Sequence, residues 1–206
     1  MPDATNTLSS LRELIQLLKY NWNCPAARVL GRMLAESLLK LEPDFEDEET
    51  LIVPVPLYKG ERRPRGFNPA EMIALEALKA YPVKTRFGLT TDLLVRIRDT
   101  HSQIGLTSDQ QRENMRGAFV VSGAPQVTGR SVVIVDDVYT TGTTVTECAR
   151  VLRKAGAARV WVATVARTLK NASNNESFSV AEFQGAKKEA ESEEKLEVES
   201  LETLKL

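Results

Sequence analysis

The chain has 206 residues, 42% of them hydrophobic, with 2 cysteines and a formal net charge of -1. These values exclude a collagen-like, a disulfide-rich and a wholly disordered protein, and the length suffices for one domain with its own core. The sequence has no apolar run long enough to span a membrane and no secretory leader, so we expect a cytoplasmic protein. Cys24 and Cys148 form no C-x-x-C pair, so we do not expect a zinc site.

Two amphipathic helices are predicted near the N-terminus. Apolar residues recur at helical spacing over 8–18 and again over 26–41. Pro43 and the acidic run at 46–49 end the second pattern. We therefore expect residues 1–45 to form a helical layer that packs against the rest of the chain.

Residues 50–168 alternate between short buried strands and helices. Strands are predicted at 51–53, 93–95, 132–135 and 160–165, and helices at 70–80 and 143–154. A strand–helix–strand succession of this length requires a right-handed crossover between parallel strands. The sequence therefore predicts an α/β fold, with a parallel sheet flanked by helices. Residues 170–206 are dominated by Glu, Lys and Ser, and we expect them to form an acidic, mostly disordered tail.

Charge is unevenly distributed along the chain. Residues 1–49 and residues 170–206 each carry a net charge of -4, whereas residues 50–169 carry +7. A cationic middle between acidic flanks favours an anionic ligand, although an ordinary solvated surface would account for the same charges. Charge alone does not distinguish a nucleic acid from a small phosphorylated molecule.

The segment 132–144 carries the strongest chemical signal. A buried strand ends in Asp136 and Asp137, and a loop of small residues around Gly142 then leads directly into a helix. Ligands of open α/β sheets bind at this edge, and the start of a helix offers unpaired N–H groups to a phosphate. The paired carboxylates would accept hydrogen bonds from sugar hydroxyls. Together these parts predict a site for ribose 5-phosphate.

A purely structural interpretation of the same residues is that the two acids cap a turn and the threonines cap a helix. The complete arrangement favours the phosphate site, since neither G-x-x-x-x-G-K-[ST] nor G-x-G-x-x-G after a strand occurs in the chain.

Residues 132–144 resemble the diphosphosugar-binding motif of type I phosphoribosyltransferases, whose common donor is 5-phosphoribosyl 1-diphosphate (PRPP). Tyr139 differs, because an aliphatic residue is usual there. Further stretches resemble the ComF group of competence-associated, phosphoribosyltransferase-like proteins over about residues 17–168: 18–20, 54–57, 65–68, 100–106 and 112–119. That group often begins with a four-cysteine zinc module, which this sequence lacks, and Pro69 stands where Gln is usual.

The resemblance implies a role for each matching residue. Asp136 and Asp137 would be the catalytic acids that bind the ribose hydroxyls, and the phosphate would lie on Thr140, Thr141, Gly142, Thr143 and Thr144. The loop after the first strand would lie near the diphosphate, with Leu57, Tyr58, Lys59 and Arg65. Mg²⁺ would be the cofactor, bound through PRPP and the two acids rather than at a site made by protein alone. Arg62, Arg63 and Arg65 suit an anionic leaving group, although each could equally be a solvated surface charge.

Residues 96–116 would form a mobile lid, since this connection is longer than an ordinary loop. Its closure would keep water from the cationic sugar that forms when diphosphate leaves. The resemblance assigns lid contacts to Thr100, Gln103, Arg112 and Asn114. His101 could act as a general base, but the sequence provides no carboxylate partner for it, and it could equally be an ordinary loop residue.

Two functions follow from this sequence. The first is an enzyme that transfers a 5-phosphoribosyl group to an unidentified nitrogen acceptor with release of diphosphate. The second is a PRPP-sensing protein that contacts protein partners in DNA uptake or processing. We do not expect direct nucleic-acid binding, because no helix-turn-helix, zinc finger or interleaved aromatic and basic pattern occurs. The sequence is also compatible with a homodimer.

Overall fold

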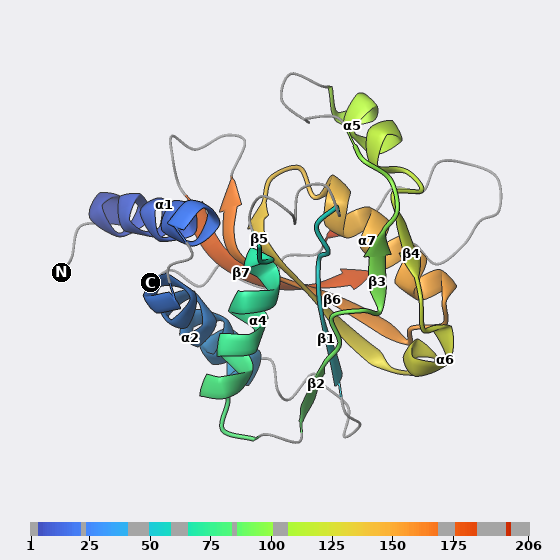
Figure 1. Ribbon diagram of the computed structural model, residues 1–206, viewed down its shortest axis with the longest axis horizontal. Helices are drawn as coiled ribbons and strands as arrows, with labels where there is room; N and C mark the ends of the chain where they lie inside the picture. The colour runs from blue at the N-terminus through green and yellow to red at the C-terminus, as the bar shows by residue number, and fades with distance from the viewer. Residues whose placement is uncertain are drawn as a thin grey trace.

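The computed structural model describes residues 4–21, 24–40, 50–58, 66–83, 86–100, 107–168, 176–184 and 197–198 (Figure 1). The helices are α1 (Ala4–Asn21), α2 (Cys24–Lys40), α4 (Pro69–Ala80), α5 (Ser108–Met115), α6 (Ala124–Val127) and α7 (Thr143–Lys154). The strands are β1 (Thr50–Pro54), β2 (Phe87–Leu89), β3 (Leu94–Arg96), β4 (Phe119–Val121), β5 (Ser131–Tyr139), β6 (Arg159–Thr168), β7 (Glu176–Gln184) and β8 (Glu197–Val198).

The main sheet has the strand order β2-β1-β5-β6-β7-β8. The strands β2, β1, β5 and β6 are parallel, as the alternation of strands and helices predicts. The strand β5 lies between β1 and β6, with Leu51 opposite Val132 and Val133 opposite Trp161. Because β5 lies in the centre of the sheet and both faces of the sheet are covered, its run of four β-branched residues, 132–135, is completely buried.

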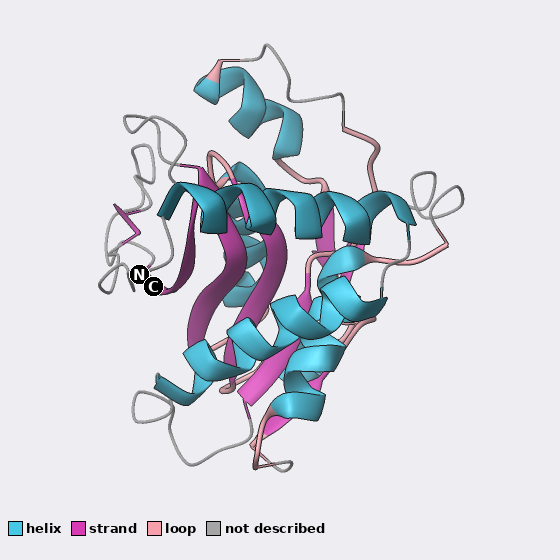
Figure 2. Cartoon of the chain, turned by 90° about the vertical axis from the view of Figure 1, so that its left-hand side faces the viewer, coloured by secondary structure: helices cyan, strands magenta, loops and turns pink. Residues whose placement is uncertain are grey.

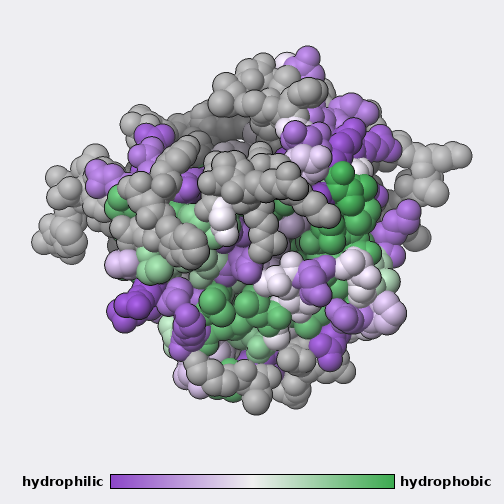
Figure 3. Space-filling model, in the orientation of Figure 1, coloured by the Kyte–Doolittle hydropathy of each residue, from purple (hydrophilic) through white to green (hydrophobic). Residues whose placement is uncertain are grey.

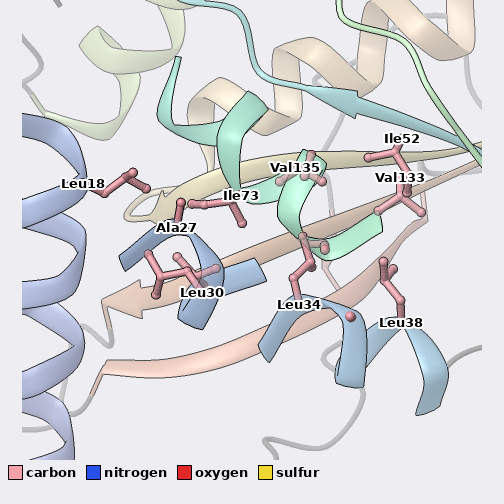
Figure 4. Packing of buried hydrophobic residues seen from close by; sticks show 14 of the residues in the cluster. Leu18, Ala27, Leu30, Leu34, Leu38, Ile52, Ile73, Val133 and Val135 are labelled. Carbon is pink, nitrogen blue, oxygen red and sulfur yellow. The ribbon is translucent and has the colours of Figure 1, made fainter. Parts of the chain in front are cut away.

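Helices cover both faces of this sheet (Figure 2). The helices α1, α2 and α4 lie on one face, where Val133 and Val135 point, and α7 lies on the other with Val132 and Ile134. Figure 4 shows Leu30 and Leu34 of α2 in the first of these cores. The two layers of helix fix the sheet between them and leave the carboxyl ends of β1, β5 and β6 at one common edge.

The segment predicted as a strand at 93–95 forms β3, but outside the main sheet. It pairs antiparallel with β4 in a separate two-stranded hairpin that packs beside α7. Figure 3 shows apolar surface gathered over this hairpin, where Ile97 and Val120 are 56% and 38% exposed. The hairpin therefore supports the connection predicted as a lid rather than extending the sheet.

A strand also occurs within 170–206, the segment for which the sequence predicts mostly disorder. The strand β7 pairs antiparallel with β6, and β8 pairs with β7. Polar and apolar residues alternate only over 177–180, which is too short a pattern to reveal the strand within the surrounding Glu- and Lys-rich composition. The other residues of the segment lie outside the described ones. No helix in the described part of the chain is both long and apolar enough to cross a membrane.

Candidate ribose-phosphate site

The strand β5 carries Asp136 and Asp137 past the buried core to the sheet edge. The Oδ1 of Asp136 accepts a hydrogen bond of 2.9 Å from the N–H of Asp137, and the Oδ1 of Asp137 accepts one of 2.8 Å from the N–H of Val138. Each carboxyl group is thus fixed by the backbone through one oxygen. Because successive side chains of a strand point to opposite faces, the two acids lie in different surroundings.

Asp136 lies on the α7 side of β5. Burial, followed by the negative charge of Asp137, raises the pKa of this carboxyl well above its ordinary value. Burial likewise raises the pKa of the thiol of Cys148 on α7, and the charge of Asp136 adds to that rise. Asp136 therefore retains its proton more readily than an exposed carboxyl does.

A threonine stands opposite Asp136 on the next strand. Thr164 of β6 is in register with Asp136 and is 1% exposed. Its Oγ1 makes no hydrogen bond to any part of the chain that the structure describes. A buried hydroxyl without a partner is costly, and this one lies beside the carboxyl of Asp136 at the carboxyl end of the sheet.

Asp137 faces the N-terminal helices. Its Oδ2 lies 2.6 Å from the Nζ of Lys19, near the end of α1. The two side chains are 17% and 26% exposed, so the pair is only partly screened by solvent. The acids thus lie in unequal surroundings: both are partly buried, but Asp136 lies on the α7 side of the strand, whereas Asp137 is held by a lysine from a distant part of the sequence.

The loop after β5 leads directly into α7. Gly142 has φ of +75° and precedes the first residue of the helix, Thr143. Within the described residues, no side chain caps this helix end, so the N–H groups of its first turn remain available to an anion. The hydroxyls of Thr141 and Thr143 lie 2.9 Å apart, whereas Thr140 is exposed and Thr144 partly buried. All the residues predicted for phosphate binding therefore lie on one turn beside the acids.

Tyr139 closes one side of this turn. A Cβ atom built on Gly142 would lie 2.2 Å from the phenol oxygen of Tyr139. The left-handed backbone favours glycine at this position, and a Cβ atom there would also have to displace the ring of Tyr139.

The loop predicted for the diphosphate begins at the same edge. The N–H of Val55, just after β1, donates a 2.8 Å hydrogen bond to the carbonyl of Val135 in β5, which brings the partly buried Leu57 and Tyr58 near the end of β5. Lys59, Arg62, Arg63 and Arg65 lie outside the described residues.

Asn68 ends this loop. Its Nδ2 donates to the carbonyl of Val55 at 2.9 Å, and its Oδ1 accepts from the N–H of Ala70, so the side chain both closes the loop and caps α4.

The segment predicted as the lid contains a helix. Thr107 and Gln110 form a capping box that starts α5. At the base of the lid, the guanidinium of Arg98 donates to the carbonyls of Asn114 at 2.8 Å and Arg116 at 2.7 Å, which ties the two arms together. Thr100 is buried and accepts a hydrogen bond from Arg96. Arg112 is exposed on α5, and His101 and Gln103 lie outside the described residues.

Glu147 of α7 binds the backbone at Gly117, directly after the segment predicted as the lid. Its Oε1 accepts hydrogen bonds from the N–H of Gly117 at 2.8 Å and from Arg150 at 2.7 Å, and its Oε2 accepts from Arg150 at 2.8 Å. Burial opposes the charge of this carboxylate, but the hydrogen bonds from Arg150 and Gly117, with the charges of Arg150 and Arg116, outweigh burial and lower its pKa. The base of the segment predicted as the lid is therefore tied to the same helix whose first turn is predicted to bind the phosphate.

The two acids do not fit a divalent metal ion held by the protein alone. Mg²⁺ takes near-octahedral oxygen ligands, and a carboxylate must be ionised to bind it. The Oδ2 of Asp137 is bound to the ammonium of Lys19, and Asp136 retains its proton more readily than an exposed acid. In the described ranges, no group of three His, Cys, Asp or Glu side chains gathers that could hold a metal ion.

The site contains residues that sequence reasoning did not assign to it. Lys19 lies in a stretch that supports the family resemblance, but the helix was predicted only as a packing layer. Thr164 is hidden in an apolar strand, and nothing in the local sequence indicates that it faces Asp136. Glu147 lies on a predicted helix, and its link to Gly117 depends on tertiary structure.

Comparisons with known proteins show which proteins this chain resembles in sequence. The family model described as "Phosphoribosyl transferase domain" matches residues 66–194. Competence protein F of Haemophilus influenzae is 28% identical over 162 residues, which are 78% of this chain and 69% of that protein. DNA utilization protein YhgH of Escherichia coli (strain K12) is 32% identical over 166 residues, which are 77% of this chain and 68% of that protein.

Among solved structures, the glutamine PRPP amidotransferase from B. subtilis aligns with a TM-score of 0.42 and 23% identity, over 68% of this chain and 26% of that one. The chain spans about two thirds of the length of the curated relatives described above. The family model matches more than half of the chain, and YhgH of Escherichia coli is more than 30% identical over more than two thirds of its length. This chain therefore belongs to the ComF family of phosphoribosyltransferase-like proteins.

Proposed function

We propose that this protein binds PRPP and transfers its 5-phosphoribosyl group to a nitrogen acceptor, with release of diphosphate. The observation that carries the proposal is the single turn from β5 to α7. It presents Asp136 and Asp137 beside the uncapped start of a helix. A sugar hydroxyl needs acceptors such as these carboxyls, and a phosphate needs N–H donors such as this helix start.

The chemistry requires no covalent nucleophile from the protein. Breaking the bond between C1 and the diphosphate oxygen leaves a cationic sugar, and the electron pair leaves with the diphosphate. The acceptor nitrogen then forms the new bond to C1 and loses its proton. Asp137 orients the sugar by accepting hydrogen bonds from its hydroxyls, and the segment tied to α7 by Glu147 excludes water from the cationic sugar.

Mg²⁺ enters this proposal as the partner of the diphosphate of PRPP, not as a resident ion of the protein. A diphosphate offers the hard oxygen ligands that Mg²⁺ prefers. The acids do not need to supply a metal site for this role.

A second function is a PRPP-responsive partner protein in DNA uptake or use. The names of Competence protein F and DNA utilization protein YhgH favour it, because both point to handling of DNA rather than to a metabolic acceptor. In this role the chain would keep the ribose-phosphate site and act by contacting other cytoplasmic proteins. Its two cysteines are both free, which is compatible with that compartment.

Calorimetric titration with PRPP tests the binding site. We expect saturable binding that is at least about tenfold tighter with Mg²⁺, and loss of most of it in Asp137→Asn. Asp92→Asn is the matched control, because Asp92 is exposed and lies outside the site. Equal heats for Asp137→Asn and the parent protein would refute the site.

An assay for diphosphate separates the two functions. The protein is incubated with PRPP and single bases or amines, and released diphosphate is measured. Release that depends on one acceptor supports the transferase. Saturable binding of PRPP without release under any acceptor supports the sensing protein.

A further inference from the structure

Lys19 is placed at the proposed ribose site by a packed helix and not by a flexible loop. The neighbouring Leu18 is completely buried, and Leu11 and Ile15 of α1 lie in the same core. Figure 4 shows Leu18 pointing toward Ala27 of α2. A lysine anchored in this way loses little further freedom when it binds a ligand, which is the condition for a preorganised contact.

The hydrogen bonds that Asp137 and Lys19 make leave further donors and acceptors for a sugar. One oxygen, Oδ1, is taken by the N–H of Val138, and the other, Oδ2, faces the ammonium of Lys19 at 2.6 Å. A carboxylate oxygen has more than one lone pair, and an ammonium has three N–H donors. The pair can therefore accept a hydrogen bond from one hydroxyl of a diol and donate one to the oxygen of the other.

We propose that Lys19 is a ligand-binding residue of the ribose subsite, where its ammonium, paired with Asp137, takes the place of a divalent metal ion. The inference rests on the proposed function, since it concerns the same site. A metal ion at the Oδ2 of Asp137 would have to displace Lys19 or approach a positive charge. The protein thus supplies the cation beside the sugar hydroxyls, and Mg²⁺ is needed only by ligands that carry a diphosphate.

Ribose 5-phosphate separates these two roles, because it has the sugar and the 5-phosphate of PRPP but lacks the diphosphate. Its binding is measured by calorimetry in EDTA and in excess Mg²⁺, for the parent protein and for Lys19→Met, Lys19→Arg and Lys79→Met. The last variant is the control, because Lys79 pairs with Glu76 on the surface of α4. Thermal unfolding of each variant is recorded in parallel.

We expect the parent affinity to change less than about threefold between EDTA and Mg²⁺. Lys19→Met should lose about tenfold or more in both buffers, since a charged hydrogen bond is removed. Lys19→Arg should retain most of the affinity, and Lys79→Met all of it. Retention by Lys19→Arg distinguishes ligand binding from a simple loss of folding in Lys19→Met.

Two results would overturn the inference. One is binding of ribose 5-phosphate by the parent protein that disappears in EDTA. The other is unchanged affinity in a folded Lys19→Met variant. Failure of the parent protein to bind ribose 5-phosphate or PRPP in either buffer would instead refute the proposed function itself.

Discussion

The phenol of Tyr139 lies against the backbone of Gly142, so close that a Cβ atom on that glycine would be 2.2 Å from the phenol oxygen. The same glycine has φ of +75° and starts α7. Backbone conformation and side-chain packing therefore both restrict the turn that we propose as the phosphate site.

Gly142→Ala should destabilise the protein by about 2–3 kcal/mol and abolish binding of ribose 5-phosphate. About 1 kcal/mol is the cost of a left-handed alanine, and the remainder comes from the contact with Tyr139. Gly129→Ala provides the control, because Gly129 has the same φ with no atom within 4 Å of an added Cβ. Chemical denaturation and calorimetry measure both effects. Equal losses of stability in the two variants would contradict the role of Tyr139, and Tyr139→Val should recover part of the loss in Gly142→Ala.

Glu147→Gln should lower the free energy of unfolding at neutral pH by about 1–3 kcal/mol, because a buried, charged acceptor is removed from Gly117 and Arg150. The pKa of Glu147 is lowered in the folded protein, so its stabilisation is present above the ordinary value of 4.5 and is lost as the pH falls through the folded pKa. The difference between variant and parent should therefore shrink on acidification. Denaturation curves from neutral to acidic pH test this.

Lys79→Gln serves as the control for Glu147→Gln, because the exposed pair of Lys79 and Glu76 should contribute under about 1 kcal/mol. A difference between Glu147→Gln and the parent that stays constant with pH would contradict the assignment of the stabilisation to the ionised carboxylate.

The local parts of the fold and site could be predicted from the sequence because they depend on short patterns. The run at 132–135 has four consecutive β-favouring residues and is the clearest strand in the sequence, and the acids, the small loop and the helix that follow are contiguous. The prediction of helices at 70–80 and 143–154 is confirmed by α4 and α7 for the same reason.

The parts that sequence reasoning missed depend on tertiary contacts or on weak patterns. No local feature brings Lys19 to Asp137 or Glu147 to Gly117. The helix α5 has a polar sequence without a clear apolar face, so only its capping box at Thr107 signals it. The strand β3 has the apolar composition of a strand in the main sheet. It pairs with β4 instead, and its local sequence does not indicate that partner.

Gly31→Ala should destabilise the protein by about 1–3 kcal/mol, although alanine favours a helix more than glycine does. A Cβ atom at Gly31 of α2 would lie 2.5 Å from the Cβ of Glu76 and 2.8 Å from the backbone nitrogen of Ala77 on α4. The two helices would have to separate, which would open the core. Arg28→Ala is the control for the helical preference, because Arg28 is exposed on α2. A Gly31→Ala variant as stable as the parent in chemical denaturation would contradict this close crossing.

Asp136→Asn should raise the free energy of unfolding at neutral pH by about 1 kcal/mol while it weakens binding of ribose 5-phosphate, since residues that serve a site often reduce stability. Burial and the charge of Asp137 raise the pKa of Asp136, so the folded state favours its protonated form. The parent protein therefore loses stability as the pH rises from the ordinary value of 3.8 through the folded pKa, and the advantage of asparagine should grow over that range and then level off.

The amide of Asp136→Asn can keep the hydrogen bond from the N–H of Asp137, so the backbone turn should persist. Denaturation across this pH range tests the prediction, and a variant less stable than the parent at neutral pH would contradict it.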